Sequence, residues 1–314
     1  MSLRKFYLVI TSILLVFLFL SGTIMLNYLK TYSASDITED SSNNFFKDAM
    51  KHFIINKEPI NVLILVGDKW ESNTDTMILV NFDPTTYELN ILSIPRDTKV
   101  ILDNNKAVKI NSIFVNKGGD VLLMKILSDM LGIDIQHYIY FNIETFRKII
   151  DLLGGVWVDV PVDLDYDDPI QDLHIHLKKG RQLLDGEKAE QYLRFRHPNA
   201  YYSNELMQYY DGSDIKRIEA QQNFIKELID QKLNIAYISK LNDIVDTVFE
   251  NLKTNISLSE IMNWVSGFNI KNFSMDKVHT YILPGYAADS TPWYYICDEE
   301  KTKELINNNF SLKK

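Results

Sequence analysis

The fold class follows from a short part of the chain, which begins Asn61-Val62-Leu63-Ile64-Leu65-Val66-Gly67-Asp68 and continues, after one loop, as Thr74-Asp75-Thr76-Met77-Ile78-Leu79-Val80. Both runs are too short for surface helices and too uniformly apolar for strands that are exposed on one face. Runs of this kind are typical of buried strands in a covered sheet. We therefore expect two neighbouring strands of an α/β sheet here.

A third strand and an abrupt stop follow the first two. Asp83-Pro84-Thr85-Thr86 has turn chemistry, because proline pre-sets its φ for a tight turn, and residues 88–94 resume a strand pattern. The sequence predicts a hairpin at this turn, which makes the sheet mixed. The third strand ends in Ser93-Ile94-Pro95-Arg96-Asp97. Charged residues thus gather where strands end, which is where open α/β sheets bind ligands.

Helix and strand patterns alternate over the following part of the chain. Helical periodicity runs over 120–130, over 144–153 and from 214 onward, and strand patterns lie at 137–141 and 156–160. Such alternation is typical of layered α/β proteins. We therefore predict one large α/β domain with a mixed sheet.

The first thirty residues indicate the compartment. Residues 6–26 carry no charge over 21 positions, which at about 1.5 Å per residue spans the roughly 30 Å hydrocarbon core. Arg4 and Lys5 precede this segment, so the positive-inside rule keeps the N-terminus in the cytoplasm. A cleaved signal peptide is the alternative, but its apolar core is normally about 7–15 residues long and ends in a small-residue cleavage site. We expect an uncleaved single-pass anchor in the cell membrane and an extracellular domain.

Composition argues against a nucleic-acid-binding protein and against a fold held by disulfides or zinc. Non-specific nucleic-acid binding requires clustered Lys and Arg that neutralise phosphates, whereas this chain has a net charge of −9. We therefore expect no nucleic-acid partner. The single cysteine, Cys297, cannot form an internal disulfide, and no set of Cys and His has zinc-finger spacing.

Two aspartates at predicted strand ends are candidate metal ligands. Asp68 and Asp75 are separated by one loop, so their carboxylates can converge on a hard cation such as Mg²⁺. Mg²⁺ typically takes one or two carboxylates and leaves its other positions to water and phosphate oxygens. Taken one at a time, aspartates at such positions are more often turn residues, so the metal interpretation depends on the pair.

Four arginines are candidate phosphate ligands. Arg96 follows a strand end, where a guanidinium can bind phosphate oxygens in a bidentate manner. Arg194 and Arg196 lie on one face of a predicted extended segment, and such close like charges repel unless an anion lies between them. Arg217 lies four residues before Gln221 near the start of a predicted helix, and helix starts favour anions. The alternative for each is an ordinary surface residue.

Two further motifs are interpreted as structural. His174-Ile175-His176 resembles a metal-binding pair, but no carboxylate or third histidine has supporting spacing, so alternation along a strand is the favoured interpretation. Tyrosines cluster at 201–202 and 209–210, within a segment, 198–213, that we interpret as a loop insertion. They could contact a glycan or the membrane, or pack within the loop. The sequence has no glycine-rich phosphate loop and no nucleophile elbow.

Together these segments resemble the LytR-CpsA-Psr family of bacterial cell-envelope proteins. The resemblance covers about residues 57–235 in order, and the single N-terminal anchor also fits the family. The matching segments are 61–68, 74–83, 92–98, 109–111, 118–119, 131–133, 153–156, 158–161, 165–169, 184–189, 194–197 and 214–221.

The resemblance implies an α/β fold with three α/β/α layers around a central mixed β-sheet, preceded by one N-terminal transmembrane helix. It also implies an apolar tunnel for a polyprenyl tail. The chain then divides into a cytoplasmic N-terminus (1–5), a transmembrane anchor (6–28), an extracellular linker (29–56) and a catalytic domain (57–312).

The resemblance also implies an activity. Members of the family are Mg²⁺-dependent phosphotransferases that move a glycopolymer, such as teichoic acid or capsule, from an undecaprenyl-pyrophosphate carrier to peptidoglycan; Mn²⁺ is an alternative ion. Their metal ligands correspond to Asp68 and Asp75. We assign catalysis to Arg96, with Asp97 as the candidate general base. The pyrophosphate-binding residues correspond to Arg96, Arg194, Arg196, Arg217 and Gln221.

Two departures from the family pattern bear on the donor and acceptor preference more than on the reaction. The family usually has a basic residue two positions before its second aspartate, where this chain has Asn73, and segment 198–213 is longer than usual. Two other functions stay open at this point. One is a non-catalytic envelope regulator or polyprenyl-pyrophosphate-binding module, and the other is a hydrolase that uses water as its acceptor.

Overall fold

The computed structural model of the chain describes residues 59–67, 73–170, 172–199, 203–232, 252–257, 260 and 275–310. The predicted anchor at 6–28, the linker at 29–56 and the candidate metal ligand Asp68 lie outside these residues. Within the part of the chain that is described, no helix combines the length and the apolar character needed to cross a membrane.

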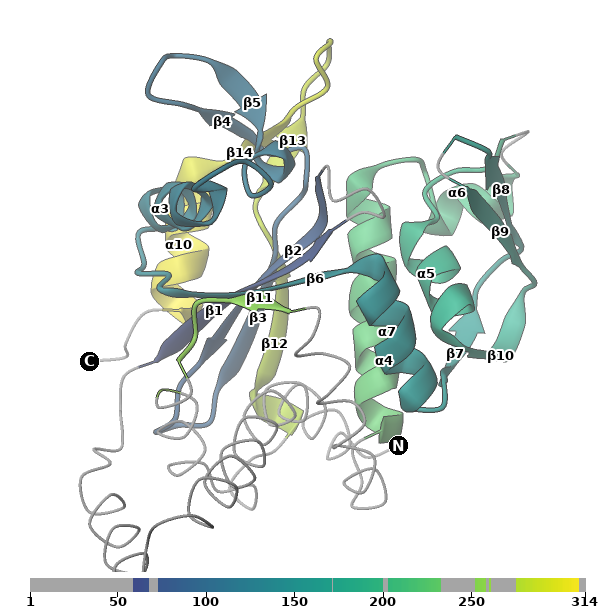
Figure 1. The fold of residues 1–314 in the computed structure, drawn as a ribbon. Coiled ribbons are helices and arrows are strands. Elements are labelled where there is room, and N and C mark those ends of the chain that lie inside the picture. The colour runs from purple at the N-terminus through teal and green to yellow at the C-terminus, as the bar shows by residue number, and fades with distance from the viewer. Residues whose placement is uncertain are drawn as a thin grey trace, which may run out of the picture.

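A six-stranded mixed sheet forms the centre of the fold, in the order β11-β6-β1-β2-β3-β12 (Figure 1). Strand β2 runs antiparallel to β1 and β3, whereas β6 is parallel to β1 and β12 is parallel to β3. The predicted central mixed sheet is therefore confirmed. Its strands are β1 (Ile60–Gly67), β2 (Thr74–Phe82), β3 (Leu89–Ser93), β6 (His137–Asn142), β11 (Lys253–Thr254) and β12 (Val278–Ile282).

The hairpin between β2 and β3 forms at the predicted turn. The Asp83 carboxylate accepts hydrogen bonds from the backbone N–H of Thr85, the hydroxyl of Thr85 and the backbone N–H of Thr86, at 2.7, 2.6 and 3.3 Å. These bonds hold the turn closed, as is usual for an aspartate that begins a turn. The pairing places the start of β2 at the same sheet edge as the ends of β1 and β3, with Gly67 opposite Thr74.

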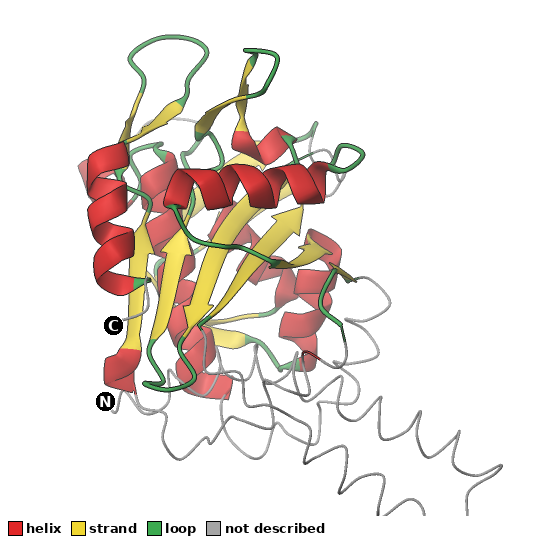
Figure 2. Ribbon diagram, turned by 90° about the vertical axis from the view of Figure 1, so that its left-hand side faces the viewer, coloured by secondary structure: helices red, strands yellow, loops and turns green. Residues whose placement is uncertain are grey.

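Helices cover both faces of the sheet (Figures 1 and 2). Leu79 and Leu92 of the central strands pack into the core on the α3 and α10 side, whereas Val80 and Ile91 pack into the core on the opposite side. Because successive strand residues point to opposite faces, two cores require the uniformly apolar runs seen in the sequence. The helices are α3 (Gly119–Leu131) and α10 (Glu299–Asn309) on one face, and α4 (Ile143–Leu152), α5 (Gly186–Arg194) and α7 (Asp214–Lys232) on the other.

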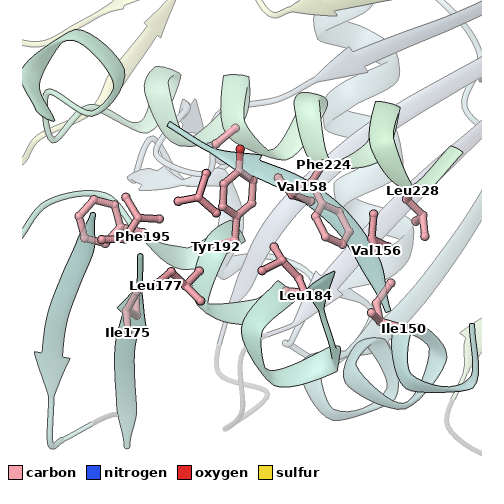
Figure 3. Packing of buried hydrophobic residues seen from close by; sticks show 14 of the residues in the cluster. Ile150, Val156, Val158, Ile175, Leu177, Leu184, Tyr192, Phe195, Phe224 and Leu228 are labelled. Carbon is pink, nitrogen blue, oxygen red and sulfur yellow. The ribbon is translucent and has the colours of Figure 1, made fainter. Parts of the chain in front are cut away.

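Two pairs of strands extend the side of the fold that contains α5 and α7. Strand β7 (Val156–Val160) pairs with β10 (Gly180–Leu184), and β8 (Leu164–Asp168) pairs with β9 (Leu173–Leu177). Figure 3 shows Tyr192 and Phe195, at the end of α5, in the same core as Ile175 of β9 and Phe224 of α7. This packing fixes the β8–β9 hairpin against the end of α5.

The segment 198–213 contains a helix, α6 (Asn204–Tyr209), where a loop insertion was expected. Ser203 caps it, because its hydroxyl accepts the N–H of Leu206 at 3.0 Å. Tyr210 is buried and its ring packs edge to face on Phe195 at a centroid distance of 4.9 Å, so this tyrosine belongs to the core. Tyr201 and Tyr202 lie outside the described residues.

Two small hairpins and two short 3₁₀ helices complete the described structure. The hairpins lie beyond the sheet edge at which β1 and β3 end (Figure 1). Their strands are β4 (Lys99–Ile101) with β5 (Ala107–Lys109), and β13 (Gly285–Ala287) with β14 (Tyr295–Cys297). The 3₁₀ helices are η1 (Ile110–Ser112) and η4 (Met275–Lys277).

Candidate active site

Charged residues from four parts of the chain converge on a pocket of about 190 Å³. The pocket lies where β2 begins, β3 has ended, α5 ends and α7 begins. Four arginines and one carboxylate line it, so its field is positive and suits an anion. The lining residues are Asp75, Arg96, Tyr166, Leu173, Arg194, Arg196, His197 and Arg217.

The end of β1 and the start of β2 bring Asp75 to the pocket. The register of the pair shifts between Val66 and Gly67. A side chain at position 67 would collide with the ring end of the buried Tyr140, so any residue other than glycine would require that ring to shift. Gly67 pairs with Thr74, so Asp75, the second residue of β2, lies next to the end of β1.

Two carboxylates hold Arg96 and Arg217 in place. Arg96 Nη1 donates to Asp75 Oδ1 at 2.7 Å, and Arg96 Nε lies 3.7 Å from Asp214 Oδ1. Arg217 Nη2 lies 2.5 Å from the same Asp214 oxygen and donates to the backbone carbonyl of Asp75 at 3.3 Å. The Arg96 backbone N–H also donates to Asp214 Oδ2 at 3.3 Å. This network joins β2, the end of β3 and α7.

The charges of the network set the protonation states. Burial raises the pKa of Asp75, but Arg96, Arg217 and Arg194 together outweigh it, and the pKa lies below the ordinary value. Asp75 is therefore ionised at neutral pH. Burial lowers the pKa of Arg217 to about 10, with Asp214 opposing the change, so Arg217 stays protonated at neutral pH. Burial also lowers the pKa of Arg96, but the charges of Asp75 and Asp214 outweigh this effect, so the pKa lies above its ordinary value.

In the part of the chain that the structure describes, three guanidinium donors of this cluster have no hydrogen-bond acceptor. Among the residues that the structure describes, the buried Nε groups of Arg96, Arg196 and Arg217 make no hydrogen bond. A buried donor left in this state costs about 1–3 kcal/mol. Unsatisfied donors next to a positive pocket indicate a ligand that is rich in anionic oxygens.

Arg194 and Arg196 both reach the pocket, but Arg194 does so from the end of a helix and not from the predicted extended segment. Arg194 is the last residue of α5, and the chain becomes extended only at Phe195, with φ −62° and ψ 132°. Phe195 is fully buried and fixes the position of its two neighbours. Arg194 Nη1 donates to Glu190 Oε1 at 2.9 Å, and Arg196 Nη2 donates to the carbonyl of Gly212 at 2.9 Å.

Of the predicted site residues that the structure describes, two do not line the pocket. The carboxylate of Asp97 lies 2.8 Å from Lys109 Nζ. Gln221 Nε2 donates to Thr76 Oγ1 and to the carbonyl of Leu193, both at 3.3 Å. Gln221 thus links β2 to the residue that precedes Arg194.

The sequence did not indicate three residues that the structure places at the site. At the start of α7, Ser213 Oγ accepts the N–H of Lys216 at 3.3 Å, while Asp214 pairs with Arg96 and Arg217. Tyr166 and His197 line the pocket with their rings edge to face at 5.2 Å. The signal available for His197 was its position next to Arg196, and for Tyr166 its place among aspartates in 165–169.

The pocket offers a hard cation one suitable ligand among the described residues, the carboxylate of Asp75. Asp75 offers an ionised carboxylate beside four guanidinium groups that suit phosphate oxygens. A carboxylate together with phosphate oxygens is the ligand set that Mg²⁺ prefers. The other predicted ligand, Asp68, follows Gly67 directly in the chain.

The chain matches the model of one protein family and several named relatives. The model of the LytR_cpsA_psr family matches residues 24–311. The chain is 27% identical over 300 residues to the polyisoprenyl-teichoic acid–peptidoglycan teichoic acid transferase TagV of Bacillus subtilis, which covers 89% of this chain and 72% of that protein. It is 26% identical to biofilm regulatory protein A of Streptococcus mutans, with 96% of this chain and 77% of that protein covered.

Solved structures show the same fold. The crystal structure of TagV from B. subtilis superposes with a TM-score of 0.63 at 27% identity, over 81% of this chain and 98% of that one. A structure described as TagT bound to LI-WTA superposes with a TM-score of 0.58 at 25% identity, over 83% of this chain and 94% of that one.

Proposed function

The chain belongs to the LytR-CpsA-Psr family, and on that premise we propose that it is a membrane-anchored extracellular phosphotransferase. It transfers a glycopolymer, such as teichoic acid or capsule, from an undecaprenyl-pyrophosphate carrier to peptidoglycan. The observation that supports this most directly is the pocket in which four arginines surround the ionised Asp75. The relatives named as teichoic acid transferases support the choice of substrate class.

The proposed reaction is a displacement at phosphorus. The primary hydroxyl oxygen of the peptidoglycan acceptor attacks the phosphorus next to the glycopolymer, and a new P–O bond forms. The bond between that phosphorus and the bridging oxygen breaks, polyprenyl phosphate leaves with its electron pair, and the hydroxyl proton passes to a base. Negative charge grows on the leaving phosphate in the transition state. Positive charges that are already fixed near this phosphate therefore lower the barrier.

The arginines of the pocket supply those charges. Arg96 is fixed by Asp75 and Asp214, and Arg194 is fixed by Glu190, so neither guanidinium has to reorganise during the reaction. The Nε groups of Arg96 and Arg196 provide donors that a pyrophosphate would satisfy. We assign pyrophosphate binding to Arg96, Arg194, Arg196, Arg217 and Gln221.

Asp68 and Asp75 would hold Mg²⁺, with Mn²⁺ as the alternative ion. When bound, the ion supplies further positive charge to the pyrophosphate oxygens. Asp75 supports this assignment because it is ionised and lies at the pocket. Asp97 is the proposed general base, and its ion pair with Lys109 fixes the orientation of its carboxylate.

The anchor and the compartment are part of the proposal. The uncharged segment 6–26 behind Arg4 and Lys5 supports an N-terminus in the cytoplasm and a catalytic domain outside it. Protease added to intact cells is expected to degrade the domain. Recovery of a shortened, soluble form from the medium would show instead that the segment is cleaved.

One assay separates transfer from the alternative functions. The full-length chain is incubated with a polyprenyl-pyrophosphate-linked glycan, with and without peptidoglycan and with and without Mg²⁺. The proposal expects glycan attached to peptidoglycan only when all components are present. Release of phosphorylated glycan without peptidoglycan would identify a hydrolase, and saturable binding without turnover would identify a regulator or binding module.

A further inference from the structure

Two aspartates and two histidines share the outer face of the β8–β9 hairpin. The strands pair so that Asp165 lies opposite His176 and Asp167 lies opposite His174. Ile175, which lies between the two histidines, is buried, whereas both histidines are exposed. The expectation that no carboxylate supports the histidine pair was therefore wrong, because the carboxylates come from the partner strand.

The donor atoms of this cluster are close together. His174 Nδ1 lies 2.5 Å and His176 Nε2 lies 3.4 Å from the same oxygen, Asp167 Oδ1. Ligand atoms of these three residues all fall within 4.8 Å of one another. Donor atoms around a tetrahedral Zn²⁺ are about 3.4 Å apart, as bond lengths of about 2.0–2.2 Å require. The three side chains are 45–57% exposed, so small rotations can reach that spacing.

Each histidine also has a carboxylate at its second nitrogen. His176 Nδ1 lies 2.9 Å from Asp165 Oδ1, and His174 Nε2 lies 3.9 Å from Asp172 Oδ1. Both rings therefore turn one nitrogen toward Asp167 and the other toward an outer acid. Histidines that bind metals typically give their second N–H to a carboxylate, which fixes the tautomer and the ring orientation. Ordinary surface pairing of histidine and aspartate does not require this shared arrangement.

We propose that Asp167, His174 and His176 form a binding site for a divalent transition-metal ion, with Zn²⁺ as the best match. Two imidazoles and one carboxylate are a common set of zinc ligands, and water can take the fourth position. Mg²⁺ prefers oxygen ligands in octahedral geometry, so this site differs in its chemistry from the one proposed at Asp75. Asp165 and Asp172 act as orienting residues.

The proposed site lies behind one wall of the catalytic pocket. Tyr166 stands between Asp165 and Asp167 and, because strand residues alternate, it faces the other way and lines the pocket. Leu173, next to His174, lines the same pocket. An ion that joins β8 to β9 would therefore stabilise the strand pair that carries this wall.

Direct metal binding tests the proposal. The full-length chain, prepared without a polyhistidine tag and treated with chelator, is titrated with Co²⁺. We expect one tightly bound Co²⁺ per chain with the visible absorption of tetrahedral coordination, displaced by Zn²⁺ but not by Mg²⁺. Saturating Zn²⁺ should also raise the melting temperature. A chain that binds no Co²⁺ saturably, or only with octahedral spectra, would overturn the assignment.

Variants locate the ion. His176→Ala and Asp167→Asn each remove a ligand and should weaken Co²⁺ binding at least about tenfold, since loss of an orienting group alone typically costs about 10–100-fold. Asp167→Asn keeps the side-chain size, so it serves if His176→Ala folds poorly. Matched controls are Lys178→Ala, whose ammonium pairs with Asp163 on the same hairpin, and His279→Ala, whose ring pairs with Glu88 elsewhere. Unchanged affinity in both ligand variants would show that the metal binds elsewhere.

Discussion

Arg96 Nη1 lies 2.7 Å from Asp75 Oδ1. This contact joins the start of β2 to the chain just beyond the end of β3. The same guanidinium lies 3.7 Å from Asp214 at the start of α7. One arginine is thus shared by two carboxylates on different elements. Because the proposed substrate is a polyanion, any change to this pair should alter both stability and catalysis.

Asp75→Asn should show a pH-dependent loss of stability. The pKa of Asp75 is below its ordinary value of 3.8, so its contribution is fully present above that pH and disappears as the pH falls through the folded-state pKa. The variant should be less stable at pH 7 by about 1–2 kcal/mol, and this deficit should shrink as the pH falls below 3.8 toward the folded-state pKa. Thermal melts at pH 7 and pH 2.5 measure the difference. An equal deficit at both values would mean that packing, not charge, is lost.

Arg96→Lys should retain the charge and lose most of the function. An ammonium cannot reproduce the planar guanidinium that serves Asp75, Asp214 and a phosphate together. We expect kcat/KM in the transfer assay to fall at least about tenfold, which corresponds to about 1.4 kcal/mol. Arg181→Lys is the matched control, since Arg181 is half exposed and lies 3.5 Å from Glu227. Equal activity of the two variants would remove Arg96 from the catalytic residues.

Asp97→Asn and Lys109→Ala together test the proposed base. A general base contributes about 10²–10⁴-fold, so Asp97→Asn should lower kcat by that order and flatten the acidic side of the pH–rate profile. Lys109→Ala breaks the same ion pair but keeps the carboxylate, and should have a much smaller effect on kcat. If both variants lose the same small amount of activity, Asp97 is structural.

Glu190→Gln should destabilise the end of α5. Glu190 is almost fully buried, accepts a hydrogen bond from Arg194 at 2.9 Å and pairs with Arg147. Removing one charge from a buried pair costs about 3–5 kcal/mol, and because Arg147 is partly exposed we expect about 3 kcal/mol. A pyrophosphate analogue should restore part of the melting temperature, because it offers Arg194 another anion. Glu227→Gln, which alters an ion pair with the exposed Arg181, is the control.

Local patterns were sufficient for the strands and the first hairpin. The apolar run at β1 and the turn at Asp83 lie close together in the chain, and their chemistry determines the structure without distant contacts. Arg194 was placed in an extended segment because a charged-apolar-charged triplet has the period of a strand. The packing of Tyr192 and Phe195 instead continues α5 to Arg194, and such tertiary packing overrides a three-residue pattern.

The remaining site residues depend on contacts between distant parts of the chain. Asp214 meets the backbone of Arg96 across 118 positions, so no local spacing could reveal it. The carboxylates near His174 and His176 were missed because they depend on the register of β8 against β9. A shift of one residue would have turned them to the other face of the hairpin.

The separation between Arg96 and Asp214 also orders events during folding. The β2–β3 hairpin closes from adjacent segments, on a timescale of about 1–10 μs for hairpins in general. Joining Arg96 to Asp214 closes a loop of 118 positions and waits for α7 to dock. A chain still emerging during synthesis therefore contains the whole β2–β3 hairpin before it contains the residues of α7 that complete the anion site. On the proposed function, a chain in which α7 has not yet docked lacks Asp214 and Arg217 at the pocket, so we expect it to bind the pyrophosphate of the carrier more weakly than the folded protein.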